Sequence, residues 1–136
     1  MPLEIVNPSS LPAPRGWSHG VLGPPGGRAL FIAGMSGIGG AADGKLPPLV
    51  EQFGSCLDQT LEVLRAAGAA PTDVARMTVY VTDLAAYRAN LKALGAAWRE
   101  RFGKHYPAMA LVEVKGLVDP NALVEIETTA VVPGER

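Results

Sequence analysis

Three carboxylates, Glu113, Glu125 and Glu127, lie on the last two predicted strands and have to be weighed as site residues or as structural ones. Glu113 lies in a largely apolar run, on the same predicted face as Met109 and Leu111, and Glu125 and Glu127 alternate with apolar residues in a second run. A carboxylate in an apolar cleft has a raised pKa, which suits it to act as a general base toward water. Glu125 alternates with Val124 and Ile126, so an outward-facing strand residue explains it equally well. Glu113 and Glu127 are better explained as structural or interface carboxylates.

The histidines, the cysteine and a glycine-rich stretch give weaker signals. His19 is a lone histidine that one hydrogen bond would satisfy, and His105 is expected in a loop near an interface, with entry into a cleft left open. Cys56 lies near the apolar face of a predicted helix, which is typical of an inert core thiol. Residues 34–40 lack the lysine of a phosphate-binding loop and favour a plain turn. The two histidines are far apart and have no paired acidic motif, so we expect no metal site and no cofactor.

Two helices and several short strands must position these residues. Apolar residues recur at spacings of three and four from Val50 to Leu64, which predicts a helix that Gly68 ends. Asp83 is a natural N-cap for a second helix that runs to Phe102. Strands are expected at 17–22, 29–33, 74–82, 109–115 and 123–132.

The order of these elements is typical of an α+β fold in which both helices cover one face of a mostly antiparallel or mixed sheet. The other face is expected to carry Tyr80, Leu111, Leu123 and Val131 among polar residues. An apolar sheet face needs a cover, and no third helix is predicted, so we expect another copy of the chain to supply it. The 136 residues are expected to form one domain, 1–136.

The charge balance narrows the choice of partners. The net charge is −1, and the 12 basic and 13 acidic residues are spread along the chain. No basic block is present, which argues against a nucleic-acid partner. No apolar run reaches signal-peptide length at the start, and none approaches the roughly 18 residues of a membrane-spanning helix. We therefore expect a cytoplasmic protein with no membrane partner.

Several segments resemble the Rid/YjgF family, also known as YjgF/YER057c/UK114 and as endoribonuclease L-PSP-like, in order and spacing. They are a proline-rich opening, a strand and turn, a mid-chain strand with its turns, and two closing strands, at 7–21, 30–35, 68–83, 106–114 and 124–127. The resemblance implies a chorismate-mutase-like fold and a homotrimer whose sheets form a central barrel. It also implies small carboxylate ligands in clefts between subunits, and hydrolysis of reactive enamines and imines to ketoacids and ammonia.

The resemblance implies roles for individual residues, and here the sequence departs from the family pattern. Glu125 aligns with a glutamate that positions the attacking water, and Asn90 matches a position near the site. Met109 stands where deaminating members have an arginine that clamps the substrate carboxylate. A thioether cannot form the paired charged hydrogen bonds of a guanidinium. Trp17 and Ala33 replace a common tyrosine and a hydroxyl residue, which makes the cleft more apolar.

The leading hypothesis is a Rid-like hydrolase of an imine, an enamine or a related C–N bond. Glu125 would position water, and backbone amides near Gly34 or Leu111 would orient the ligand. Because Met109 carries no charge, we expect neutral or apolar substrates to be preferred over 2-imino acids. The alternatives are a non-catalytic small-molecule-binding or regulatory trimer and, with less support from the charge pattern, an endoribonuclease. The sequence leaves open whether a cation elsewhere replaces the missing charge, the candidates being Arg15, Arg28 and Arg88.

Overall fold

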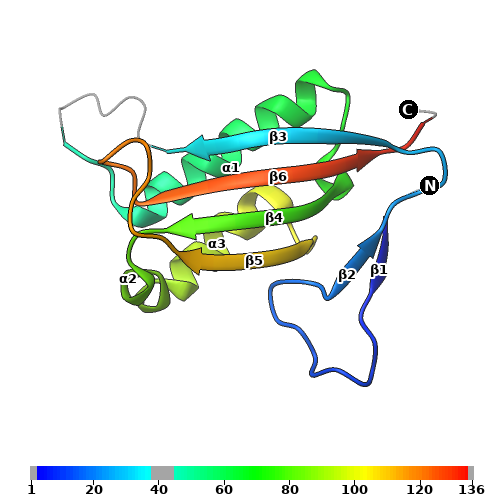
Figure 1. The fold of residues 1–136 in the computed structure, drawn as a ribbon, viewed down its shortest axis with the longest axis horizontal. Coiled ribbons are helices and arrows are strands. Elements are labelled where there is room, and N and C mark those ends of the chain that lie inside the picture. Colours follow the sequence, from blue (N-terminus) through cyan, green and yellow to red (C-terminus); the bar gives the residue numbers. More distant parts are fainter. Residues whose placement is uncertain (1–2, 38–44, 135–136) are drawn as a thin grey trace.

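A four-stranded sheet with helices on one face forms the body of the molecule (Figure 1). This computed structural model describes residues 3–37 and 45–134, so the part of the predicted turn from 38 to 40 lies outside the described residues. The strands, in sheet order, are β3 (Arg28–Ser36), β6 (Val124–Val132), β4 (Val74–Val81) and β5 (Ala108–Glu113). The β3–β6 and β6–β4 pairs are antiparallel, whereas β4 and β5 are parallel, so the predicted mixed sheet is confirmed.

A two-stranded ribbon, which the sequence did not predict in full, lies beside the main sheet near the start of β5 (Figure 1). It pairs β1 (Glu4–Val6) with β2 (Gly20–Leu22) in antiparallel register. The expected strand at 17–22 is therefore shorter than predicted, because the residues before Gly20 dock on β5 instead.

The first predicted helix is confirmed as α1 (Leu49–Ala66). Its buried face carries Phe53, Leu57 and Leu64 at the spacing that the sequence showed. Gly68, with a φ of 71°, follows the last turn in the left-handed conformation that commonly ends helices. A short 3-10 turn, η1 (Pro71–Asp73), then leads into β4.

The second predicted helix is divided into α2 (Leu84–Ala89) and α3 (Leu91–Phe102). Asn90 separates them with a φ of −118° and a ψ of 20°, outside the helical region. Its side-chain amide donates to the carbonyl of Ala86 at 2.7 Å, a local bond that competes with the regular helix pattern. None of the helices within the described ranges is long and apolar enough to cross a membrane.

Helices α1 and α3 pack against the same face of the sheet, and the face toward the viewer in Figure 1 is uncovered. Tyr80 and Val131 lie on the uncovered face as predicted, because the residues that flank them in β4 and β6 are buried under the helices. Leu111 is a correction. It pairs with buried Val79 and packs against the core, so it faces the helices and not the open side. Phe31 is the most prominent apolar residue of the open face, with 79% of its surface exposed.

The completely buried side chain of Gln52 joins helix α1 to the loops at the end of the sheet where β6 begins. Its Nε2 donates to the carbonyl of Pro47 at 3.0 Å, and its Oε1 accepts from the backbone N–H of Leu123 at 2.8 Å. Gly37 approaches the same turn so closely that a Cβ there would lie 2.1 Å from the Gln52 carbonyl oxygen. These contacts fix the position at which β6 enters the sheet.

Candidate functional site

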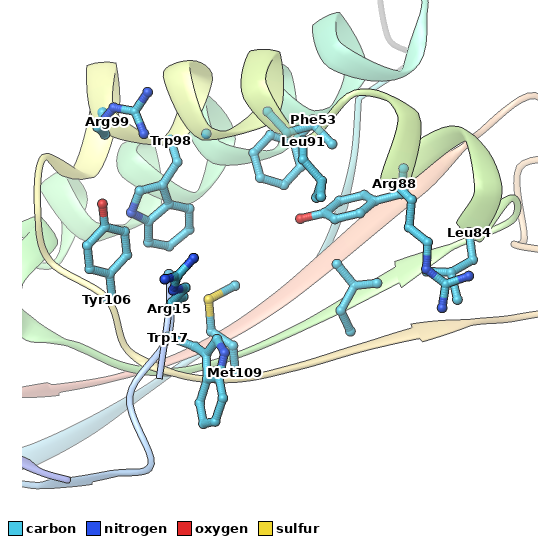
Figure 2. A pocket seen from close by; sticks show the side chains of 15 residues that line it. Arg15, Trp17, Phe53, Leu84, Arg88, Leu91, Trp98, Arg99, Tyr106 and Met109 are labelled. Carbon is cyan, nitrogen blue, oxygen red and sulfur yellow. The ribbon is translucent and has the colours of Figure 1, made fainter. Parts of the chain in front are cut away.

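A cavity of about 670 Å³ lies between β5, helices α2 and α3, and the segment around Trp17 (Figure 2). Its walls are mainly apolar and aromatic, and they include Phe53, Leu91, Leu94, Trp98, Met109 and Leu111. A cavity of this size with such walls is typical of a small-molecule site. Trp17, Met109 and Leu111, three of the residues expected at the site, are therefore brought together here.

Ser18 fastens the chain segment that closes the cavity. Its backbone N–H donates to the carbonyl of Pro107 at 2.9 Å, and its hydroxyl donates to the carbonyl of Tyr106 at 2.5 Å. The segment thereby extends the edge of β5 in parallel register. Because this bond pattern holds position 18, Arg15 and Trp17 are placed at the cavity wall.

The indole of Trp98 forms a second wall and is held from three sides. Its Nε1 donates to the carbonyl of His105 at 3.1 Å, and its ring stacks on Phe102 and Tyr106 at centroid distances of 4.6 and 6.3 Å. The His105 ring nitrogen Nε2 lies 2.7 Å from the carbonyl oxygen of Val74. His105 therefore joins the end of α3 to β4, and it does not line the cavity.

Arginine is the only charged residue type in the cavity wall, and it occurs there three times, as Arg15, Arg88 and Arg99. Within the part of the chain that the structure describes, none of the three forms an ion pair with a carboxylate. The phenol of Tyr87 also lines the wall, and burial raises its pKa. It therefore remains a neutral hydroxyl at physiological pH. In Figure 2, Arg88 lies beside Leu84 at one end of the cavity, whereas Arg15 and Met109 lie nearer Trp98 and Tyr106.

Glu125 lies elsewhere, on the uncovered face of the sheet. It pairs with Tyr80 of β4 and with Ser36 of β3, which places its side chain opposite the helices. A Cβ at Gly34 would be 2.8 Å from Glu125 Oε2, so the carboxylate lies directly against the Gly34 backbone. The neighbouring Tyr80 hydroxyl donates to Glu127 at 2.7 Å, and this hydrogen bond raises the pKa of Tyr80.

Within a single chain, the expected site residues therefore lie in two groups on opposite faces of the sheet. Met109 pairs with buried Met77 on the helix side, whereas Glu125, Gly34 and exposed Ala33 belong to the other side. Asn90 joins neither group, since its amide is bound to the Ala86 carbonyl.

The remaining carboxylate of the closing strands, Glu113, caps a helix. Its Oε1 accepts from the backbone N–H of Leu84 at 2.9 Å, beside the predicted N-cap Asp83, whose Oδ1 accepts from Ala86 at 3.1 Å. Between residues 3 and 37 and from 45 to 134, no group of three or more His, Cys, Asp or Glu side chains could hold a metal ion.

Several cavity residues share one helix stripe, and sequence reasoning named only one of them for the site, Arg88, as a candidate for the missing charge. Leu84, Arg88, Leu91, Gly95 and Arg99 follow one another at spacings of three and four along α2 and α3. Gly95 leaves room for the Arg99 guanidinium, whose Nη1 would be 3.2 Å from a Cβ at that position. The spacing was visible in the sequence, but a stripe of mixed arginine and leucine is typical of an ordinary helix edge. Only the segment around Trp17, which lies across from the stripe, makes it one side of a cavity.

Comparison with known proteins gives consistent results. The Endoribonuclease L-PSP family model matches residues 8–132. A 2-iminobutanoate/2-iminopropanoate deaminase of Capra hircus is 32% identical over 131 residues, covering 94% of this chain and 89% of that protein. A RutC family protein of Pyrococcus horikoshii is 33% identical over 135 residues, covering 93% and 96%.

Solved structures show the same likeness. The structure of YyfB from Yersinia pestis, a protein of unknown function of the conserved Rid protein family, is 35% identical. It superposes with a TM-score of 0.78 over 97% of this chain and 100% of that chain. A family model that matches nearly the whole chain, together with relatives at 32% and 33% identity along most of its length, shows that the chain belongs to the Rid/YjgF family.

Proposed function

We propose that this protein hydrolyses an imine or enamine to a carbonyl compound and ammonia, in a cleft that two copies of the chain form together. Membership of the Rid/YjgF family supports the reaction class, and relatives in Capra hircus and Bos taurus carry the name 2-iminobutanoate/2-iminopropanoate deaminase. The endoribonuclease alternative has no basic tract to support it, since the 12 basic residues are spread along the chain.

The observation that carries the proposal is the position of Glu125. Its carboxylate lies on the uncovered sheet face against the Gly34 backbone, whereas the cavity lies on the helix side. A carboxylate on one face cannot reach a ligand on the other face of its own chain. A second copy that docks on the open face would bring its cavity edge and the first copy's Glu125 together. The exposed ring of Phe31 on the same face supports such docking, and we propose the homotrimer of the family as the assembly.

The chemistry needs one base and one mobile proton. Glu125 accepts a proton from water as the water oxygen bonds to the imine carbon, and the C=N electron pair moves to nitrogen, which takes up a proton. The resulting carbinolamine then breaks its C–N bond. The electron pair leaves with nitrogen as ammonia once nitrogen has gained a further proton, and the hydroxyl loses its proton to give the carbonyl. The sum is imine plus water to carbonyl plus ammonia.

The test is ammonia release from imines generated in situ, for example by an amino-acid oxidase acting on amino acids of graded size. We expect the protein to accelerate the release, and Glu125→Gln to lower kcat by about 100-fold or more. Glu51→Gln, an exposed change in the first turn of α1, is the matched control and should have no effect. If no imine reacts faster with the protein, or if Glu125→Gln is as active as the control, the hydrolase proposal fails and the ligand-binding alternative replaces it.

A further inference from the structure

We infer that the cavity binds an anion with a large apolar or aromatic body, and that Arg15, with Arg88 and Arg99, supplies the charge that Met109 cannot. The inference concerns the substrate class of the proposed hydrolase and rests on that proposal only for the reaction. The recognition itself follows from the cavity.

The first step is the charge of the wall. Arg15, Arg88 and Arg99 line the cavity, and no acidic residue does. Where carboxylates are in reach, arginines of this chain do pair, as Arg101 does with Asp58 at 2.6 Å. The cavity arginines have no such partner among the described residues, and a guanidinium remains protonated at all physiological pH values. The wall is therefore positively charged, and a carboxylate is the ligand group that complements it.

The second step is the placement of Arg15. The Ser18 hydrogen bonds to Pro107 and Tyr106 hold the segment that carries Arg15 and Trp17 against the start of β5. Figure 2 shows Arg15 at the same end of the cavity as Met109. The cation therefore comes from the covering segment and not from β5. A carboxylate held there would lie near the Met109 end, and its apolar part would extend along α3.

The third step is the size of the apolar part. The rings of Phe53, Trp98 and Tyr106 and the side chain of Leu94 line an open cavity of about 670 Å³. A two- or three-carbon chain would leave most of this surface in contact with water. An aromatic or long aliphatic body would cover it, and the removal of apolar surface from water is what favours binding. The expected substrates are thus imino acids with large apolar side chains. This expectation takes the place of the neutral ligand that Met109 alone suggested.

Both tryptophans of the chain line the cavity, so intrinsic fluorescence reports on binding without any turnover. The probes are 3-phenylpropionate, its neutral amide 3-phenylpropionamide, and propionate. We expect the phenyl acid to bind at least about tenfold more tightly than either the amide or propionate, and added salt to weaken only the acid. Arg15→Gln should weaken the acid by about tenfold and leave the amide unchanged. Arg28→Gln, an exposed change outside the cavity wall, is the matched control.

Equal binding of the acid and the amide would overturn the inference, and so would no binding of the acid. Unchanged affinity for the acid in all three variants, Arg15→Gln, Arg88→Gln and Arg99→Gln, would overturn it as well. Glu125→Gln separates it from the proposed reaction, because this variant should bind the phenyl acid normally while losing ammonia release. Acid binding that depends on the arginines, without hydrolysis of any imine, would leave the inference standing and remove the reaction. If all three arginine variants retain imine hydrolysis in full, the proposed reaction stands and the inference about the arginines fails.

Discussion

The carboxylate of Glu125 lies directly over the backbone of Gly34. A Cβ atom at position 34 would be 2.8 Å from Oε2 and 2.9 Å from the carboxyl carbon, closer than such atoms can approach. Strand β3 has an irregular register between Ile32 and Met35, so the glycine lies where the strand departs from regular pairing with β6. The absence of a side chain at Gly34 therefore decides where the Glu125 carboxylate can lie.

Gly34→Ala should move the carboxylate without unfolding the chain. The atoms in the way belong to the end of a flexible side chain, and the glycine has no positive φ that alanine would strain. We expect kcat for imine hydrolysis to fall by about tenfold or more, because a misplaced base loses much of its effect, while the melting temperature hardly changes. Gly116→Ala, where nothing lies within 4 Å of the added Cβ, is the control. Full activity in Gly34→Ala together with an inactive Glu125→Gln would show that Gly34 does not set the carboxylate position.

Met109→Arg should convert the cavity toward small substrates. Met109 faces the helices from β5 and lines the cavity. An arginine at this position restores the cation that the family resemblance implies there. Charged hydrogen bonds to a carboxylate contribute about 1.5–3 kcal/mol. We expect kcat/KM for 2-iminobutyrate to rise by roughly tenfold or more, as followed by ammonia release. Met109→Leu, which conserves volume and adds no charge, should give no such rise. Wild-type turnover of 2-iminobutyrate as fast as that of Met109→Arg would contradict this prediction.

The sequence was most informative where one face of an element is apolar and the other polar. The period of α1 and the glycine at 68 defined that helix almost to the residue, and the alternation in β4 and β6 gave their buried faces. In Ala108–Glu113 nearly every residue is apolar, so alternation cannot tell which half faces the core. Pairing with β4 decides it, which is why Leu111 was expected on the wrong face.

The candidate site was predictable only in part, for a related reason. Glu125, Trp17 and Met109 could be singled out through the family resemblance, but their division between two sheet faces depends on the strand register. Arg99 was missed because it is an exposed charged residue on a helix edge, and only the position of the cavity shows that it lines the site. The break at Asn90 arises from a local side-chain bond that no periodicity shows.

Gln52→Leu should destabilise the chain strongly, although the glutamine and leucine side chains are similar in volume. The leucine leaves the N–H of Leu123 and the carbonyl of Pro47, both in partly buried hydrogen bonds, without their Gln52 partners. An unsatisfied buried group costs about 1–3 kcal/mol, so we expect the free energy of unfolding to fall by about 2–4 kcal/mol in urea titrations. The exposed Glu62→Gln, which disturbs only a surface pair with Arg65, should change it by about 0.5 kcal/mol or less. A loss in Gln52→Leu as small as that of the control would mean that the loops do not depend on this side chain.

Cys56 should be unreactive in the folded protein. Burial, with a smaller contribution from the charge of Glu125, raises its pKa from 9.0 to about 12, so almost no thiolate is present at pH 8. A disulfide reagent should modify the native chain slowly and the urea-unfolded chain rapidly. Because Cys56 is the only cysteine, one rate reports the site. Rapid modification under native conditions would show that the thiol is accessible.

The same pKa shift makes stability depend on alkaline pH. The folded thiol keeps its proton to about pH 12, whereas the thiol of the unfolded chain loses its proton near pH 9.0. The unfolded state therefore binds fewer protons in this interval, and stability falls as pH rises through it. We expect the fall to be less steep in Cys56→Ala, measured by urea unfolding at pH 8 and at pH 10.5. Identical slopes in the two proteins would mean that the thiol does not contribute.

Phe31→Glu should separate the subunits without disturbing the fold of each. The ring lies on the uncovered sheet face with 79% of its surface exposed, so a single chain gains little from it, whereas an interface on that face would bury it. We expect the wild type to sediment as a trimer and Phe31→Glu as a monomer with an unchanged circular dichroism spectrum. Imine hydrolysis should be lost at the same time, because Glu125 and the cavity that it serves would belong to different copies. Val118→Glu, a change of a still more exposed apolar residue in a loop, is the matched control and should leave both assembly and activity intact. A monomeric wild type that hydrolyses imines would contradict the two-copy site, since its Glu125 and its cavity lie on opposite faces of one sheet.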